Sequence, residues 1–171
     1  MITFITGGAR SGKSKFAQEL ALKNSKEPIY IATAKIWDKD FEQRIKQHQT
    51  DRGSEWTNYE AHQELYQLPI QNRVVVIDCV TLWLTNYFVE YKNDVERSLQ
   101  EFKLEINALS KMLGHFIIIS NELGMSMHAE TEVGRKFTDL QGWANQYVAN
   151  KANEVILMVS GLPMYVKVLK C

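Results

Sequence analysis

The segment ITFITGGARSGKSKFAQEL, which begins at Ile2, contains residue types that bind phosphate groups. Gly7 is followed by four residues and then by Gly12, Lys13 and Ser14, which is the spacing GxxxxGK[ST] of a phosphate-binding loop. In such a loop, backbone N–H groups point at the phosphates, the lysine neutralises their charge and the hydroxyl binds Mg²⁺. The residues that we expect to contact a nucleotide here are Gly7, Gly8, Ala9, Arg10, Ser11, Gly12, Lys13 and Ser14.

Asp78 is the candidate for a second protein ligand of Mg²⁺. It closes the apolar run VVVID, and open α/β sheets bind their ligands at the carboxyl ends of strands. The alternative is that Asp78 caps the helix that follows it. Because a phosphate-binding loop is already present, we favour the metal role, with Ser14 and Asp78 as the two ligands. The chain is therefore expected to bind a nucleoside triphosphate.

Five apolar runs alternate with segments of helical periodicity. The runs begin at Ile2, Ile29, Val74, Phe116 and Glu154, and their β-branched residues are typical of buried parallel strands. The helical segments are 14–23, 38 to about 52, 82–91, 94–113 and 130–152. This alternation predicts one α/β domain, residues 1–171, with three layers like the RecA-type P-loop NTPases. The final run MYVKVL predicts an antiparallel edge strand on a mostly parallel sheet, and residues 53–73 read as an irregular surface connection.

Composition excludes several classes of protein. Twenty Lys and Arg balance twenty Asp and Glu, so no net field attracts nucleic acid. The two cysteines, Cys79 and Cys171, do not make a disulfide framework or a metal cluster. No apolar run reaches the roughly 20 residues that cross a bilayer, and Met1 runs directly into an apolar strand without a basic segment. We expect a cytoplasmic protein with no nucleic-acid partner and no membrane span.

Two groups of side chains on predicted helices need interpretation. Phe41, Ile45, His48 and Arg52 share one helical face. From this spacing alone, His48 is more often a histidine at the edge of the core than a catalytic group. The charged residues of the long helix, including Glu105, indicate a face in contact with solvent.

A series of motifs resembles the adenosylcobinamide kinase / adenosylcobinamide-phosphate guanylyltransferase family. The motifs cover nearly the whole chain in the family's order: GGARSGKS with YIAT, RIKQH, DCVTLWLTN, NELGM, GWANQ and NEVILMVSGLP. The resemblance implies an enzyme of cobalamin biosynthesis with two activities. One phosphorylates the aminopropanol hydroxyl of adenosylcobinamide with GTP or ATP. The other moves GMP from GTP onto adenosylcobinamide phosphate, which gives adenosylcobinamide-GDP and pyrophosphate. The resemblance also implies a homotrimer.

The resemblance also assigns roles to residues outside the phosphate-binding loop. In this family GMP is held covalently on a histidine, which corresponds to His48 here. A neutral imidazole is nucleophilic near pH 7, and a phosphoramidate splits one displacement into two easier ones. The implied guanine-nucleotide contacts are Gln49, Thr50, Asp51, Arg52, Glu60 and Asp78, with Thr33 near the nucleotide.

The sequence departs from the family pattern at two places and leaves two alternatives open. Gly53 replaces a proline, and Ser126 to Ala129 replace Gly-Ile-Val-Pro in a loop that could touch the corrinoid. One alternative is an enzyme that retains only one of the two activities. The other is a non-catalytic GTP-binding regulatory protein, which the lack of an Asn-Lys-x-Asp guanine-reading motif disfavours.

Overall fold

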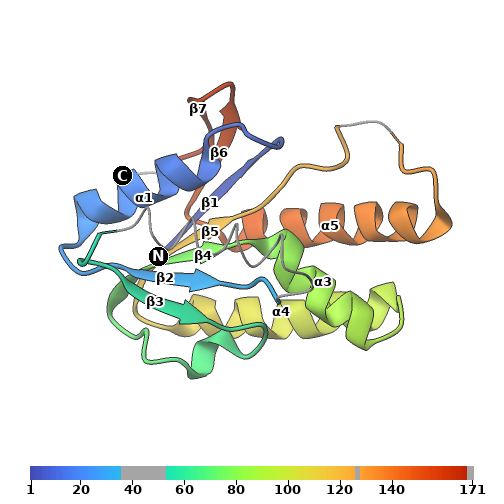
Figure 1. Ribbon diagram of the computed structural model, residues 1–171, viewed down its shortest axis with the longest axis horizontal. Coiled ribbons are helices and arrows are strands. Elements are labelled where there is room, and N and C mark those ends of the chain that lie inside the picture. Colours follow the sequence, from blue (N-terminus) through green and yellow to red (C-terminus); the bar gives the residue numbers. More distant parts are fainter. Residues whose placement is uncertain (36–52, 126–127, 169–171) are drawn as a thin grey trace.

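A seven-stranded sheet in the order β3-β2-β4-β5-β1-β6-β7 forms the centre of the computed structural model, which describes residues 1–35, 53–125 and 128–168 (Figure 1). The predicted helix 38–52 lies outside the described residues. The strands are β1 (Ile2–Gly7), β2 (Ile29–Ala32), β3 (Thr57–Glu60), β4 (Arg73–Asp78), β5 (Gly114–Ile119), β6 (Glu154–Val159) and β7 (Leu162–Lys167). The helices are α1 (Lys13–Asn24), the short 3-10 helix η1 (Leu65–Gln67), α3 (Val80–Glu90), α4 (Val95–Lys111) and α5 (Glu132–Lys151).

Every neighbouring pair of strands is parallel except the last. β6 and β7 pair antiparallel through the tight turn between Val159 and Leu162, whereas β1, β2, β3, β4 and β5 run parallel to their neighbours. This confirms the predicted α/β fold with a mostly parallel sheet and an antiparallel edge strand. In the sheet, β5 lies between β1 and β4, so the carboxyl ends of these three strands meet at one edge.

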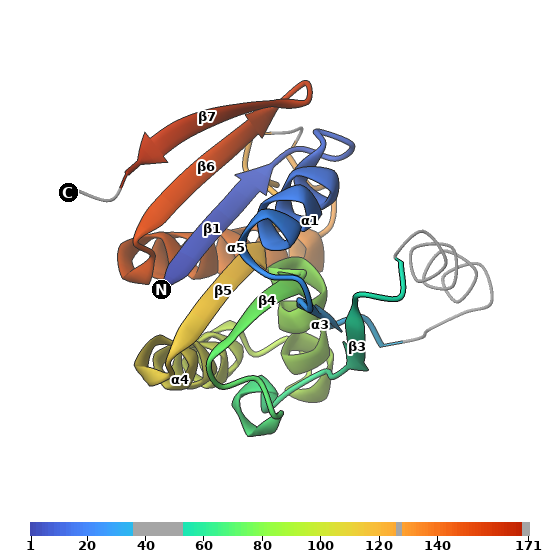
Figure 2. The same ribbon diagram turned by 90° about the vertical axis from the view of Figure 1, so that its left-hand side faces the viewer.

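Helices cover both faces of the sheet, as Figure 2 shows, with α1 on one face and α3, α4 and α5 on the other. Under α1, the small side chains of Ala17 and Ala21 are fully buried against strand residues such as Ile117. Four-residue spacing places both alanines on one helical face, which lets α1 approach the sheet closely. The larger core cluster lies on the other face around Trp83 and Phe102, whose rings meet edge to face. No helix in the described part of the chain is long and apolar enough to span a membrane.

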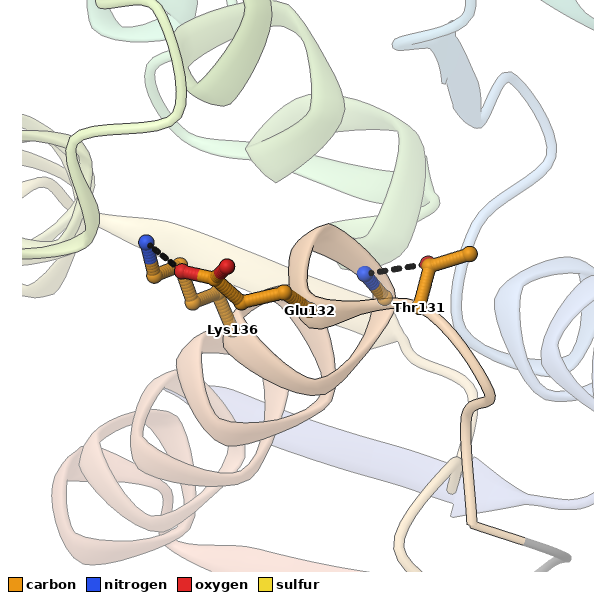
Figure 3. A network of polar contacts seen from close by, with 4 residues as sticks. Thr131, Glu132 and Lys136 are labelled. Carbon is orange, nitrogen blue, oxygen red and sulfur yellow. Dashed lines mark hydrogen bonds and ion pairs between the residues drawn. The ribbon is translucent and has the colours of Figure 1, made fainter.

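Polar contacts fix the start of α5 at Glu132 rather than at the predicted residue 130. The Thr131 hydroxyl accepts a hydrogen bond from the Gly134 N–H at 3.0 Å, which caps the helix (Figure 3). Glu132 and Lys136, one turn apart, form an ion pair at 2.7 Å. The hydrogen bond and the charge of Lys136 lower the pKa of Glu132, and a carboxylate is favourable in the first turn of a helix.

The prediction that residues 53–73 form an irregular connection was wrong for β3. Thr57–Glu60 pairs in parallel with β2 and forms one edge of the sheet. The side chains of this strand are mostly exposed, so the sequence contains no apolar run that would reveal it. Just before it, Trp56 is buried and meets the Tyr30 ring edge to face, with 6.0 Å between centroids.

Glu105 does not lie on a solvated helical face, as its charge had suggested. The residue is only 3% exposed. Its carboxylate accepts hydrogen bonds from Trp83 Nε1 at 3.0 Å, from the Leu65 N–H at 2.7 Å and from the Tyr87 hydroxyl. Burial, together with the bond to Glu105, raises the pKa of Tyr87. Glu105 thus joins α4 to α3 and η1.

Candidate nucleotide site

The phosphate-binding loop packs tightly against the end of β6 and the turn that follows. Gly7 and Gly12 have positive φ angles of 151° and 93°, which favour glycine. A Cβ atom on Gly7 would lie 2.5 Å from the Met158 carbonyl oxygen, and one on Gly12 would lie 3.2 Å from Gly161 Cα. The Gly161 N–H also donates to the Ser11 carbonyl at 3.0 Å. Glycine is therefore needed both for the turn and for the close approach of two backbones.

The loop leads directly into the N-terminus of α1. Gly12, the residue before the helix, has no side chain that could cap the N–H groups of the first turn. Lys13 is 7% exposed, and its Nζ donates to the carbonyl oxygens of Gly7 at 2.9 Å and Gly8 at 2.6 Å. Burial lowers the pKa of Lys13, while the nearby acidic groups act in the opposite direction. A helix N-terminus and an ammonium group together favour an anion.

Ser14 and Asp78, the two predicted metal ligands, lie side by side although 64 residues separate them. Ser14 Oγ donates to Asp78 Oδ2 at 3.0 Å, and the Tyr30 hydroxyl donates to the same oxygen at 2.6 Å. β4 ends at Asp78 and α1 begins at Lys13, so the fold itself brings the pair together. A hydroxyl and a carboxylate are oxygen ligands of the type that Mg²⁺ prefers.

A cavity of about 360 Å³ contains the predicted phosphate and metal groups. Its lining residues are Arg10, Ser11, Gly12, Lys13, Ser14, Lys15, Asp78, Cys79, Ile119 and Asn121. Sequence reasoning missed Asn121 as a site residue. It follows the apolar run of β5, so the strand-end argument that selected Asp78 would have selected it too.

Buried polar side chains of α5 hold the backbone around Asn121. Asn145 Nδ2 donates to the Asn121 carbonyl oxygen at 3.0 Å. Asn145 Oδ1 accepts from Ser120 Oγ at 2.6 Å and from Gln141 Nε2 at 3.0 Å. Ser120, Gln141 and Asn145 are all buried. The GWANQ motif therefore contributes, through Asn145, a side chain that fixes the end of β5.

Thr33 lies behind Asp78 rather than in the cavity. The residue is fully buried, and its hydroxyl donates to the Cys79 carbonyl and accepts from the Cys79 N–H, both at 2.8 Å. The Thr33 N–H donates to the Asp78 carbonyl at 3.0 Å. Its side chain is therefore occupied in fixing the backbone at Asp78 and Cys79.

Glu60 lies at the same edge of the sheet as Asp78. Ala32 of β2 pairs with Glu60 on one side and with Asp78 on the other. Two strand spacings place the backbones of these acidic residues about 10 Å apart. Glu60 is exposed. The other residues implied by the resemblance, His48, Gln49, Thr50, Asp51 and Arg52, lie outside the described residues, so their roles stay predictions.

Comparison with known proteins decides the family. The sequence profile described as "Cobinamide kinase / cobinamide phosphate guanyltransferase" matches residues 3–166. The chain belongs to this family. As a member it is a bifunctional cobinamide kinase and guanylyltransferase of adenosylcobalamin biosynthesis.

Full-length relatives agree with this assignment. The bifunctional adenosylcobalamin biosynthesis protein CobU of Escherichia coli is 36% identical, over 98% of this chain and 100% of the relative. The corresponding protein CobP of Pseudomonas aeruginosa is 34% identical, over 98% of both chains. CobU of Salmonella typhimurium is 31% identical over 98% of this chain and all of that protein.

Solved structures of low identity support the fold alone. The flagellar accessory protein FlaH of Methanocaldococcus jannaschii has a TM-score of 0.51 at 13% identity, covering 98% of this chain and 78% of that one. An ATPase from a bacterial type III secretion system has a TM-score of 0.53 at 14% identity, covering 91% and 50%. These neighbours place the kinase/guanylyltransferase among α/β folds like those of P-loop ATPases.

Cys79 lies in the nucleotide cavity of this enzyme but is not a suitable nucleophile. Burial, reinforced by the charge of Asp78, raises the pKa of the thiol to about 12. A thiol is reactive as its thiolate, so Cys79 stays neutral and unreactive near pH 7. Its backbone, held by Thr33, rather than its sulfur, contributes to the site.

A larger cavity of about 830 Å³ lies between α4 and α5, away from the phosphate-binding loop. Trp143, Tyr147, Leu99 and Lys103 are among its lining residues. It shares no lining residue with the nucleotide cavity. The phosphate-binding loop, Ser14 and Asp78 converge on the smaller cavity and do not line the larger one.

Proposed function

We propose that a single domain carries both activities at the phosphate-binding loop, and that GMP passes through a covalent intermediate on His48. The observation that carries this proposal is the convergence of Lys13, Ser14 and Asp78 on one cavity. These are the groups that a P-loop enzyme needs to hold a triphosphate. GTP or ATP serves as the phosphoryl donor and GTP as the guanylyl donor.

In the kinase step, the chain's own groups hold the donor and stabilise its charge. The first-turn N–H groups of α1 and the Lys13 ammonium bind the β- and γ-phosphates. Ser14 and Asp78 hold Mg²⁺, which supplies positive charge beside the phosphate oxygens when bound. Thr33 maintains the backbone at Asp78 through its bonds to Cys79. Transfer of the γ-phosphoryl group to the aminopropanol hydroxyl of adenosylcobinamide gives adenosylcobinamide phosphate.

In the guanylyl step, His48 is the nucleophile. Its imidazole nitrogen attacks the α-phosphorus of GTP, the bond to the bridging oxygen breaks and pyrophosphate leaves. A phosphate oxygen of adenosylcobinamide phosphate then displaces the imidazole, and adenosylcobinamide-GDP is released. Gln49, Thr50, Asp51, Arg52 and Glu60 contact the guanine nucleotide in this proposal. The roughly 15 residues between Thr33 and His48 span up to about 50 Å when extended, so the tether to the site edge permits this role.

The enzyme is further proposed to form a homotrimer in the cytoplasm, where GTP and ATP are available. The family resemblance motivates the trimer, and β7 supports self-association. Leu162, Met164, Tyr165 and Val166 of β7 are each more than half exposed. Exposed apolar side chains on an edge strand commonly mark a surface that another subunit covers. Size measurement in solution tests this assembly.

The decisive experiment uses GTP labelled at the α-phosphate, followed by denaturation of the protein. Wild type should retain an acid-labile, alkali-stable label. His48→Asn should lose the label and GMP transfer but keep phosphorylating adenosylcobinamide, and His62→Asn is the matched control that should label normally. Lys13→Ala should lose both reactions, because both need the phosphate counter-charge.

Two results would contradict the histidine intermediate. One is a full label on folded His48→Asn. The other is an equal loss of kinase activity in that variant, which would argue against a dedicated guanylyl role. Assaying the two steps separately also tests whether both activities are present in this chain.

A further inference from the structure

A second cavity adjoins the phosphate-binding loop on the side of Gly8. It has a volume of about 310 Å³, and Gly8, Ser11, Glu122, Met125, Leu157 and Val159 are among its lining residues. We propose that this cavity receives the alcohol-bearing arm of the corrinoid acceptor, and that Glu122 takes the proton of the attacking hydroxyl. The assignment rests on the kinase activity and on a donor held at Lys13, not on the His48 intermediate.

The position of Glu122 relative to the loop supports this role. Its backbone N–H donates to the Gly7 carbonyl oxygen at 3.0 Å, so the residue is attached to the first residue of the phosphate-binding loop. Lys13 Nζ lies 2.6 Å from the Gly8 carbonyl oxygen. A terminal phosphate held by this ammonium therefore lies beside Gly8, where the second cavity begins. Ser11 lines both cavities, which makes them neighbours across the loop.

The walls of the cavity fit a short alcohol-bearing arm attached to a large body. Leu157, Met158 and Val159 provide an apolar wall from β6, and Glu122 provides a carboxylate. A volume of about 310 Å³ is at the low end for small-molecule sites, so it accommodates a short arm and not a macrocycle. Met125 and Val159, 81% and 45% exposed, form a rim on which the corrin ring can rest. Methionine adapts well to such irregular surfaces.

The proposed step conserves atoms and charge. The acceptor oxygen attacks the γ-phosphorus, and the bond between that phosphorus and the β–γ bridging oxygen breaks. The hydroxyl proton passes to the Glu122 carboxylate, and the nucleoside diphosphate leaves with the electron pair beside Lys13. The Gly124 N–H donates to Glu122 Oε1 at 3.0 Å, which orients the carboxylate. After the product leaves, Glu122 releases the proton to water.

Glu122→Gln tests the proton acceptor, since it keeps the size of the side chain. We expect the kinase kcat with adenosylcobinamide to fall at least about 100-fold, as general-base loss usually does. In the same variant, the decline of kinase activity toward acidic pH should disappear from the pH profile. Nucleotide affinity and labelling by α-labelled GTP should stay within about threefold of wild type, because in this proposal Glu122 contacts neither the nucleotide nor His48. Glu132→Gln, an exposed glutamate at the start of α5, is the control and should match wild type.

Val159→Asp tests the cavity wall independently. A charge on this apolar rim should raise the KM for adenosylcobinamide about tenfold or more without changing the KM for the nucleotide. Val89→Asp is matched in exposure, at 49% against 45%, and should change neither KM.

The proposal is overturned if Glu122→Gln keeps a kinase kcat within about threefold of wild type, or if Val159→Asp raises both KM values equally. Nucleotide binding confirms that each variant is folded. Failure of the histidine intermediate is separately visible, because His48→Asn would then still label while both variants above behave as expected.

Discussion

Replacing Asn145 tests whether the polar network of α5 positions the nucleotide cavity. Asn145→Asp keeps Oδ1, which accepts from Ser120 Oγ and Gln141 Nε2. It removes only the Nδ2 donor, which binds the Asn121 carbonyl oxygen at 3.0 Å. A carboxylate oxygen then faces a carbonyl oxygen, so the backbone at Asn121 loses its shortest hydrogen bond and keeps the longer 3.4 Å bonds to Ser120 Oγ and Thr81 Oγ1.

The hydrogen bonds in the structure set the expected loss of stability. Asn145→Asp leaves the Asn121 carbonyl oxygen with the longer 3.4 Å bond from Ser120 Oγ and adds repulsion, which costs about 1–3 kcal/mol. Asn145→Ala removes three hydrogen bonds. Because the Asn121 carbonyl is only partly buried, water can reach it. We therefore expect the free energy of unfolding to fall by roughly 3–5 kcal/mol. Both losses are smaller than, or close to, the lower end of the free energy of unfolding typical of folded domains, about 5–15 kcal/mol. Both variants should therefore remain mostly folded at low temperature.

Denaturant unfolding and kinase kinetics together provide the assay. In a thermal unfolding experiment on a chain of this size, each kcal/mol of lost stability lowers Tm by about 2–4 °C. Because Asn121 and Glu122 follow the supported strand end, Asn145→Asp should also lower kinase kcat/KM at least about tenfold, since small misplacements are costly in catalysis. Gln146→Glu, which adds a charge at the next, exposed position of α5, is the matched control and should leave activity unchanged.

Two outcomes would refute this reasoning. The network is not a support if Asn145→Asp is within about 0.5 kcal/mol of wild type, the range of ordinary surface substitutions. A destabilised Asn145→Asp with unchanged kinetics on the folded fraction would show that the strand end does not position the site.

Three further predictions concern titratable groups that are buried or half-buried. Glu105→Ala leaves three donors without their acceptor and should lower the free energy of unfolding by roughly 3–5 kcal/mol in a denaturant titration; a loss below about 1 kcal/mol would contradict the role of Glu105. Burial and the N-terminal charge lower the pKa of His115, so the native state favours the neutral ring and stability should decline as pH falls from the unfolded pKa of about 6.5 toward the lower native value. His115→Asn should flatten this decline, and an NMR titration midpoint at or above 6.5 would count against it. Cys79, with a thiol pKa of about 12, should resist iodoacetamide at pH 8 until the protein is denatured. Peptide mapping separates its labelling from that of Cys171, and rapid labelling of Cys79 in the native protein would exclude the burial argument.

The sequence predicted the parts of the fold that depend on runs of apolar side chains. β1, β2, β4, β5 and β6 are buried on both faces, so each reads as a continuous run. The GxxxxGK[ST] spacing and the strand end at Asp78 are both local signals, and the structure brings the residues that they select to one cavity. Helix ends differed by one or two residues, as at the start of α5, where the Thr131 cap decides the boundary.

What the sequence could not provide depends on partners far along the chain. β3 is an edge strand with exposed side chains, so only its pairing with β2 defines it. Glu105 looks like a surface residue until Leu65, Trp83 and Tyr87 supply donors to it. The pairing of the Thr33 hydroxyl with the Cys79 backbone likewise joins residues 46 positions apart. Each of these depends on tertiary contacts that override local pattern.

The order of the strands explains how one short edge can support two different transfers. From β3 to β6, the carboxyl ends carry Glu60, Asp78, Asn121, the phosphate-binding loop and Val159 in spatial sequence. In the proposed arrangement the triphosphate lies over the middle of this row. The guanylyl step acts at the α-phosphate, toward β2, where the chain leads on to His48. The phosphoryl step acts at the γ-phosphate, toward the cavity that Glu122, after β5, lines together with the end of β6. In this proposed arrangement the two acceptor sites lie at opposite ends of one donor site, so a substitution at either end should impair one reaction and spare the other.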